Sequence, residues 1–326
     1  MPAAVAGTAT SFDLPQYLAT LLWLKGRRPN AFLKLIGDPT ISTSGIRRVG
    51  SQQFPMGVDF TLDAPAQPAI LQGAAPTNKE YPLEQEENVV QIFQRGVSVT
   101  YTRLGGIATI NGVAVAPGEG NGELTPAEQL LDQQIQRQLA NVQQDTNYSF
   151  LNGAYVKAAN SGVAYKTRGL LSAIATNVFA NGGTPRALTK AIVEAALQAM
   201  VANGAMQQGD TIFALAPAAE FSPLIDAYYV VNQQPTSFTV SGSAVNVIMS
   251  KWGRIVPIWE PDMPAGQIAL VQPAFCRPAV MPIPGKGELF VEPMGKVGSK
   301  EEYQIYGELG LDYTSEYLHG LIKDLS

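Results

Sequence analysis

The sequence contains little charge. Only 15% of its 326 residues are Asp, Glu, Lys or Arg, against roughly 25% in ordinary soluble domains. Hydrophobic residues make up 46%, so the chain has ample material for a core and lacks the composition of a disordered segment. A surface with few charges must be covered by amides and hydroxyls, or by other protein. The composition therefore favours a subunit buried in an assembly over a secreted protein with an uncharged polar surface.

Cysteine and histidine are nearly absent, and positive charge is not in excess. A single cysteine, Cys276, excludes an internal disulfide, and the single histidine, His319, excludes a histidine-rich zinc site. The net charge of −5 provides no basic footprint for tight binding to nucleic acid. No apolar run approaches the roughly 18 residues that cross a bilayer. The N-terminal apolar run also lacks the preceding basic residues of a secretory signal. We therefore expect cytoplasmic synthesis and no membrane partner.

No pattern in the sequence indicates catalysis, a metal or a cofactor. The glycine-rich segments "GEGNG" and "PGKGE" match neither a phosphate-binding loop nor a dinucleotide fingerprint, and we interpret them as turns. Nothing around Cys276 or His319 resembles a nucleophile elbow, so we expect Cys276 to be a small packed side chain. The paired carboxylates of a glycosidase cannot be recognised by spacing. A monomeric carbohydrate-active enzyme or surface protein therefore stays open as an alternative.

A run of strict alternation between residues 51 and 63 predicts a β-strand. Every second residue in it is apolar, which places five side chains on one face: Phe54, Met56, Val58, Phe60 and Leu62. The same pattern returns in residues 96–103, and we expect this segment to be the partner strand. The intervening residues 64–87 are rich in Pro, Ala and Gln and are too long for a structureless connection inside a domain. We predict an extended two-stranded loop that lies on something else, with a disordered loop as the alternative.

Residues 125–151 are predicted to form one long helix. Thr125 is a suitable N-cap, Pro126 occupies the first helical position and Glu128 completes a capping box. The helix would be about 40 Å long, with a stop at Asn152 and Gly153. It has a narrow apolar stripe of Leu131, Ile135, Leu139 and Val142. The rest is rich in Gln and Asn, and we predict that these amide flanks face neighbouring chains.

The remainder alternates helices and strands. We predict a helix capped by Thr184, opened by Pro185 and stopped at Gly204. A buried strand "DTIFALAP" and a helix "AAEFSPLIDAYY" follow, and then four strands, "TSFTV", "AVNVIMS", "RIVPIWE" and "QIALVQP". Period-two alternation from Tyr303 to Tyr313 predicts a long strand that returns to the hairpin region. The fold class is therefore α+β.

This order of elements, together with the run "QRQLANVQQDTNYSFLNG" followed by "TRGLLSAI", resembles the major capsid proteins of tailed bacteriophages with the Hong Kong 97 fold. The resemblance covers nearly the whole chain and implies five segments. They are an N-terminal arm (1–50), an extended loop (51–104), a peripheral domain (105–184) with a spine helix (125–151), an axial domain (185–285), and return strands with a C-terminal tail (286–326).

The resemblance also implies a function. Many copies, as hexamers and pentamers, would close an icosahedral head around double-stranded DNA, and the protein would reside in the virion. A cleaved N-terminal scaffold domain does not fit before residue 51, so either a separate scaffolding protein acts or the chain is already mature. Portal and decoration proteins are the further expected partners. An encapsulin-type compartment shell, which has the same fold, is the alternative.

Two sets of residues are candidates for contacts in such a shell. The expected inter-subunit contacts are Phe54, Met56, Phe60, Gln134 and Gln138. The basic residues that could face packaged DNA, weakly and without sequence specificity, are Lys25, Arg27, Arg28, Arg47 and Arg48.

Overall fold

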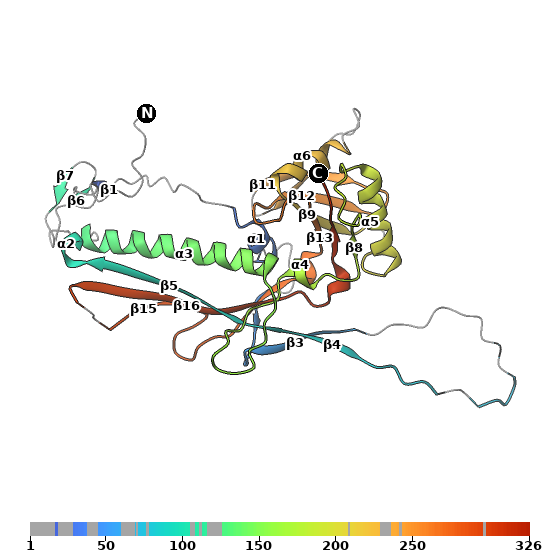
Figure 1. Ribbon diagram of the computed structural model, residues 1–326, viewed down its shortest axis with the longest axis horizontal. Helices are drawn as coiled ribbons and strands as arrows, with labels where there is room; N and C mark the ends of the chain where they lie inside the picture. Colours follow the sequence, from blue (N-terminus) through green and yellow to red (C-terminus); the bar gives the residue numbers. More distant parts are fainter. Residues whose placement is uncertain are drawn as a thin grey trace. The chain divides into compact units, whose positions relative to one another are not determined.

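Figure 1 shows the computed structural model of the chain, with its helices and strands labelled. It describes residues 17–18, 29–37, 45–59, 69, 71–75, 78–104, 108–110, 113–115, 126–207, 209–228, 236–240, 243–295 and 298–326. The α-helices are α1 (Ala31–Gly37), α2 (Tyr101–Leu104), α3 (Pro126–Asn152), α4 (Leu170–Ala173), α5 (Lys190–Ala202) and α6 (Ala218–Asp226). The first strands are β1 (Tyr17–Leu18), β2 (Arg47–Arg48), β3 (Gln53–Asp59), β4 (Glu84–Val89), β5 (Gln91–Thr100), β6 (Ala108–Ile110), β7 (Val113–Val115) and β8 (Val178–Phe179). The later strands are β9 (Thr211–Ala216), β10 (Thr236–Val240), β11 (Ser243–Met249), β12 (Arg254–Trp259), β13 (Ile268–Val271), β14 (Arg277–Val280), β15 (Leu289–Pro293), β16 (Lys300–Asp312) and β17 (Gly320–Ile322).

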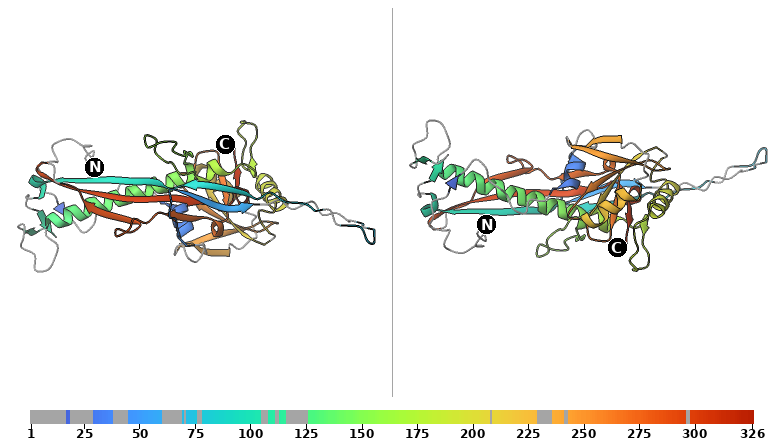
Figure 2. Two further views of the ribbon diagram at one scale, coloured as in Figure 1. Left: turned by 90° about the horizontal axis from the view of Figure 1, so that it is seen from below. Right: turned by 90° about the horizontal axis from the view of Figure 1, so that it is seen from above.

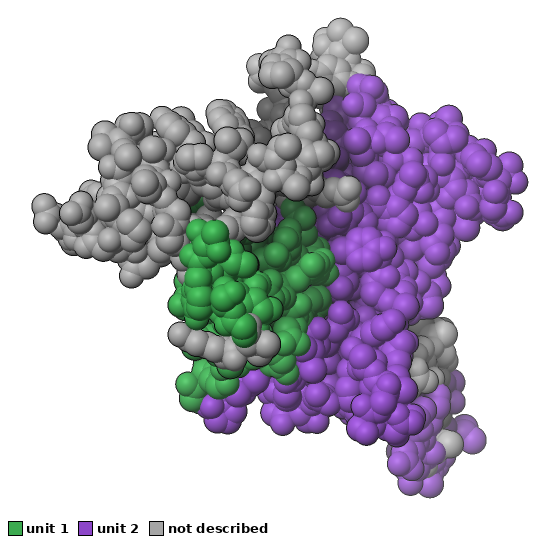
Figure 3. Space-filling model, turned by 60° about the vertical axis from the view of Figure 1, so that its left-hand side comes forward, with its two compact units in different colours: residues 1–28, 93–145, 285–307 green, residues 29–92, 146–284, 308–326 purple. Residues whose placement is uncertain are grey.

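The chain forms two compact units, coloured separately in Figure 3. Unit 1 comprises residues 1–28, 93–145 and 285–307, and unit 2 comprises residues 29–92, 146–284 and 308–326. Three long elements, α3, β5 and β16, contribute residues to both units. Each unit is therefore assembled from segments that are distant in the sequence.

Unit 2 is built on a seven-stranded sheet with the order β10-β11-β12-β9-β13-β17-β8. The sheet is mixed, because β9 runs parallel to β12 and antiparallel to β13. Side chains alternate between its faces: Ile212 and Ala214 of β9 pack with α5 and α6, whereas Phe213 and Leu215 pack with α1, α4 and the end of α3. The strands predicted from "DTIFALAP" through "QIALVQP" are confirmed as β9 to β13.

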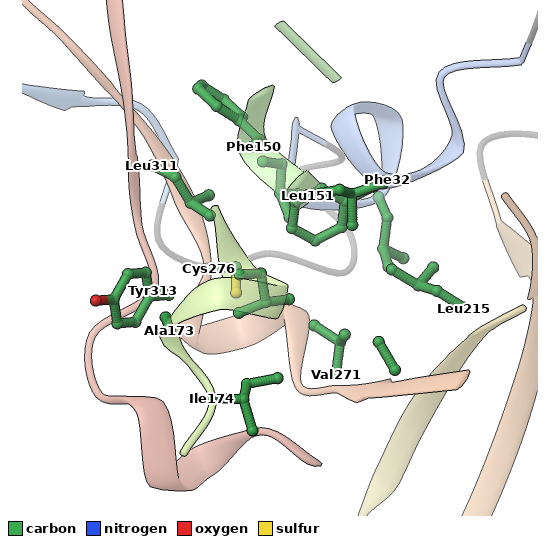
Figure 4. Packing of buried hydrophobic residues seen from close by; sticks show 14 of the residues in the cluster. Phe32, Phe150, Leu151, Ala173, Ile174, Leu215, Val271, Cys276, Leu311 and Tyr313 are labelled. Carbon is green, nitrogen blue, oxygen red and sulfur yellow. The ribbon is translucent and has the colours of Figure 1, made fainter. Parts of the chain in front are cut away.

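The larger core of unit 2 lies between this sheet and the segments around α1, α4 and the end of α3. Figure 4 shows side chains of this cluster, among them Phe32, Phe150, Leu151, Leu215 and Cys276. All five side chains are fully buried. Burial of each large apolar side chain contributes about 1.5–3 kcal/mol to stability, so this cluster is the main source of stability for the surrounding segments.

In unit 1, α3 packs on a sheet formed by β5, β16 and β15. β16 pairs with β5 and, in antiparallel register, with β15. The first half of the predicted apolar stripe on α3 covers this sheet, as Leu131 and Ile135 contact a cluster of Val97, Val99 and Tyr303. The predicted long C-terminal strand and its return to the hairpin region are confirmed by β16.

Two local predictions are wrong. The partner of β3 is β4, with Phe54 opposite Asn88, and not residues 96–103; Figure 2 shows the two strands side by side in both views. Residues 96–100 instead belong to β5, because Val97 and Val99 are needed to cover α3. The helix predicted from Thr184 begins only at Lys190. Residues before it are held elsewhere, since Arg186 forms a bridge with Leu325 near the C-terminus.

The end of α3 meets residues 167–169 at a crossing of two glycines. The Gly169 N–H donates to the carbonyl oxygen of Gly153 at 2.8 Å. A Cβ atom on Gly153 would lie 2.4 Å from the Ser149 oxygen, and one on Gly169 would lie 2.3 Å from the Gly153 nitrogen. The two backbones can approach this closely only because neither residue has a side chain. This contact links the segments "SFLNG" and "TRGLL".

Candidate inter-subunit surfaces

The hairpin β3–β4 carries an exposed, partly apolar segment. Its ladder begins at Gln53 and Val89 and ends at Asp59 and Glu84. Every described residue from 69 to 83 is exposed, including Leu71 at 85% and Leu83 at 70%. The ammonium group of Lys79 lies 4.8 Å from the ring centre of Tyr81, which is also exposed. Large apolar side chains without cover in their own chain are typical of interaction surfaces.

Two of the predicted contact residues lie instead at the buried root of this hairpin. Phe54 and Met56 are buried in the unit 2 core, so they have little side-chain surface left for a neighbouring subunit. The predicted strand is confirmed as β3, in which Phe54 and Met56 are covered by the same chain, and a register irregularity between Pro55 and Val58 interrupts its ladder with β4. Phe60 lies outside the described residues. The sequence analysis missed Leu71, Tyr81 and Leu83, which could have been recognised as isolated large apolar residues within a loop rich in Pro, Ala and Gln.

Asn88 fixes the root of the hairpin to the core. Its amide nitrogen donates to the Leu311 carbonyl at 2.7 Å, and its amide oxygen accepts from the Arg168 N–H at 2.8 Å. The side chain is fully buried, and a buried amide that satisfies its partners holds the surrounding backbones in one arrangement. The exposed segment therefore extends from a rigid base.

The two described basic residues, Arg47 and Arg48, have different surroundings. Arg47 donates to buried Asp312 at 2.8 Å, next to Arg277 at 2.9 Å from the same oxygen, and lies 5.4 Å from the Phe54 ring centre. These contacts pair Arg47 with a buried carboxylate within the subunit, and its role toward DNA stays a prediction. Arg48 is exposed. Lys25, Arg27 and Arg28 lie outside the described residues.

The amides of α3 include half-buried and exposed positions. Gln134 and Gln138 are both half-buried, and the Gln138 side-chain oxygen accepts from the Asn141 amide at 3.2 Å. An amide can form such bonds with its own helix or with another chain at a smaller desolvation cost than a charge. Their contact with a neighbouring subunit stays a prediction.

The structure brings Cys276 and His319 together in the core. Cys276 Sγ lies 3.6 Å from His319 Nε2, and both residues are fully buried. His319 Nδ1 accepts from the Gln272 N–H at 3.4 Å, which leaves Nε2 to carry the hydrogen and donate to the Tyr313 carbonyl at 3.2 Å. The nitrogen facing the thiol therefore cannot accept its proton. Burial also raises the pKa of the Cys276 thiol and lowers the pKa of His319 to about 4. This is a packed neutral pair, as predicted for Cys276.

Two acidic side chains, Glu260 and Asp262, also converge, and Glu260 caps the start of α1. The Asn147 amide donates to Glu260 at 3.1 Å and to Asp262 at 2.7 Å. The other oxygen of Glu260 accepts from the Phe32 N–H at 2.7 Å, at the start of α1. Glu260 is fully buried, and burial raises its pKa. Its oxygens already bind N–H groups of the fold, so the pair is not arranged for attack on a substrate.

A surface hollow of about 770 Å³ lies beside residues 158–166. Its lining is made of small, amide and apolar residues together with Tyr165 and one charged residue, Lys166, and contains no carboxylate. No three His, Cys, Asp or Glu side chains in the described part of the chain are grouped to hold a metal ion. Within the same residues, no helix is both long and apolar enough to span a bilayer.

Solved structures with the same arrangement come from viral and compartment shells. The capsid of cyanophage A-1(L) has a TM-score of 0.64 at 14% identity, over 98% of this chain and 99% of that one. The SrpI encapsulin of Synechococcus elongatus PCC 7942 has a TM-score of 0.60 at 14% identity, over 98% and 95%. The cyanophage Pam1 capsid has a TM-score of 0.58 at 11% identity, over 98% and 99%. At these identities the likeness shows the fold alone, which is Hong Kong 97-like as predicted.

The family is shown by a different comparison. Among curated proteins none matches the sequence. The family model described as SU10 major capsid protein matches residues 4–326. This family and the phage capsids above are structural proteins rather than enzymes, they assemble into shells of many copies, and they reside in the virion. The chain therefore belongs to the SU10 major capsid protein family and is a subunit of a bacteriophage capsid shell.

Proposed function

We propose that copies of this subunit, as hexamers and pentamers, close an icosahedral head around double-stranded DNA by laying the β3–β4 hairpin on a neighbouring subunit. The exposed segment of that hairpin carries the proposal. Leu71 and Leu83 are largely exposed and Tyr81 is 45% exposed, and burying this surface against a neighbour would contribute roughly 25 cal/mol per Å² of apolar surface. The rigid root around Asn88 supports this role, because a fixed base limits the entropy lost on docking.

The proposal extends to further components. Scaffolding, portal and decoration proteins are the partners that closing and filling such a head would use, and synthesis in the host cytoplasm precedes assembly. Contact with DNA would be weak and without sequence specificity. The net charge of −5 supports this, as does the engagement of Arg47 with Asp312, because tight binding to phosphates requires several available cations.

The mass of the native particle tests the proposal. Purified protein, with and without its scaffolding partner, is expected to form shells or capsomers visible by electron microscopy and light scattering. A stable monomer under all assembly conditions would contradict it. Particles that co-purify with a cargo enzyme instead of DNA and a portal would favour the alternative of a compartment shell.

A further inference from the structure

The hairpin β3–β4 contains a β-bulge near its root. Its ladder pairs Pro55 with Glu87 and then Val58 with Gln85. Between these two pairs β3 has two residues and β4 has one, so the ladder accommodates one extra residue in β3. A bulge bends the strand that carries it and increases the local twist. The bulge therefore sets the direction of the ladder beyond it.

Residues 313 and 314, which follow β16, contact this bulge from outside the hairpin. The Gly57 N–H, in the bulge, donates to the Thr314 carbonyl at 2.9 Å. A Cβ atom on Gly57 would lie 2.7 Å from that oxygen and 2.9 Å from Thr314 Cγ2. On the opposite strand, the Tyr313 hydroxyl is hydrogen-bonded to Glu86. Both strands of the bulge are therefore anchored to the same two residues.

Thr314 is held in a backbone conformation that a β-branched residue rarely adopts. Its φ is 60°, which lies in the left-handed region. The Thr314 N–H donates to Asp312 Oδ1 at 3.0 Å, and its Oγ1 donates to the Phe275 carbonyl at 2.8 Å. The other oxygen of Asp312 accepts from Arg47 and Arg277. A strained residue persists only where its surroundings determine its conformation, and such residues concentrate at functional sites.

We propose that Thr314 is a positioning residue, whose carbonyl fixes Gly57 and the bulge and thereby the direction in which the hairpin continues beyond Val58 and Gln85. An angular error at the bulge grows with distance along the hairpin. A closed shell is built from repeated contacts between copies, so particles of one diameter need one direction of the hairpin. This inference rests on the proposed function and names the residue that aims the hairpin.

A distance measurement in the free subunit tests this contact directly. Spin labels are placed on Gln85→Cys, beyond the bulge, and on Ser222→Cys of α6, which are both exposed positions. Buried Cys276 should not react. Thr314→Gly removes the Oγ1 bond and frees the backbone, so the width of the label-to-label distance distribution should at least double. Because glycine adopts a positive φ at little cost, the melting temperature should stay within a few degrees. Thr184→Gly, at an exposed position, is the control and should leave the width unchanged.

Gly57→Ala should change the same measurement in a different way. Its Cβ atom would push the backbones of β3 and Thr314 apart, so the mean label-to-label distance should shift beyond experimental error. Gly50→Ala is the matched control, since nothing lies within 4 Å of its Cβ position, and it should leave the mean unchanged.

Particle diameters connect the contact to assembly. Thr314→Gly should lower the share of particles with the wild-type diameter at least threefold, as measured by electron microscopy, whereas Thr184→Gly should not. An unchanged distance distribution in Thr314→Gly or in Gly57→Ala would overturn the inference, and so would wild-type diameters despite a widened distribution. Failure of the unmodified chain to assemble would count against the proposed function instead, because the distances are measured in the free subunit.

Discussion

Buried polar residues in this protein are satisfied by partners that are distant in the sequence. Asn88 binds backbone groups of Leu311 and Arg168, and Asn147 binds Glu260 and the start of α1. Each of these amides is fully buried. An unsatisfied buried amide costs about 1–3 kcal/mol, so such residues fix which segments lie together. Nothing in the local sequence around an asparagine identifies partners of this kind.

The only histidine makes the stability of the free subunit depend on pH. Burial lowers the pKa of His319 from 6.5 to about 4 in the folded chain. Between pH 7 and pH 5 the unfolded chain therefore gains a proton at this site that the folded chain does not. The free energy of unfolding should fall by about 2 kcal/mol from this group over that range.

Denaturant unfolding of wild type and His319→Gln at both pH values measures this contribution. The variant cannot titrate at this position and should lose about 2 kcal/mol less than wild type between pH 7 and pH 5. The comparison also cancels other groups, such as Glu260, whose raised pKa acts in the opposite direction. Equal losses in the two proteins would show that His319 is not held neutral by burial.

At the scale of elements, periodicity identified strands and helices well and their partners poorly. The alternation of β3 and β5 was visible in the sequence, but β3 pairs with β4 and β5 pairs with β16. Two strands with the same period-two alternation are equally good candidates for pairing with a given strand, and only the rest of the fold distinguishes them. The β5 residues Val97 and Val99 pack with Leu131 and Ile135 of α3 and with Tyr303 of β16, a contact that no pattern within either strand reveals.

At the glycine crossing at the end of α3, we expect the replacement of Gly153 by alanine to lower the free energy of unfolding strongly. Gly153→Ala would place a Cβ atom 2.4 Å from one carbonyl oxygen and 2.5 Å from another, both on the backbone. The backbone must shift to relieve this, so we expect destabilisation of about 3 kcal/mol. Gly96→Ala is the control, since nothing lies within 4 Å of its Cβ position. Thermal unfolding of the two variants checks the difference, and similar melting temperatures would contradict it.

The amide flanks of α3 lead to a prediction about assembly. Replacing both Gln134 and Gln138 with Glu adds two negative charges at half-buried positions. Charges buried without partners in an interface cost several kcal/mol, so particle yield should fall more than subunit stability. Gln143→Glu, at an exposed position on the same helix, controls for the added charge. Yield by electron microscopy and melting temperature are compared, and equal loss of both would argue against a neighbour at these amides.

At the scale of the whole molecule, the low charge content and the exposed hairpin both indicate a chain that is suited to assembly with other copies. A chain with 15% charged residues that also exposes Leu71 and Leu83 is poorly suited to exist as a soluble monomer, because charge normally keeps protein surfaces apart. The low charge content and the protruding loop were predicted from the sequence, whereas the exposure of Leu71 and Leu83 was not. Nor were the surfaces that meet, because Phe54 and Met56 carry the same apolar pattern and are buried within the subunit.

A subunit with a shortened β3–β4 hairpin is expected to fold normally but not to assemble into particles. The ladder of β3 and β4 ends at the pair Asp59 and Glu84, so residues 60–83 can be replaced by Asn-Gly, which closes two antiparallel strands with a two-residue turn. The described residues from 69 to 83 are all exposed, and removing them opens no cavity among these positions. The melting temperature of the shortened subunit should therefore stay within a few degrees of wild type, while native mass and electron microscopy should show no closed particles. Particles of normal size from the shortened chain would show that the hairpin is dispensable for assembly.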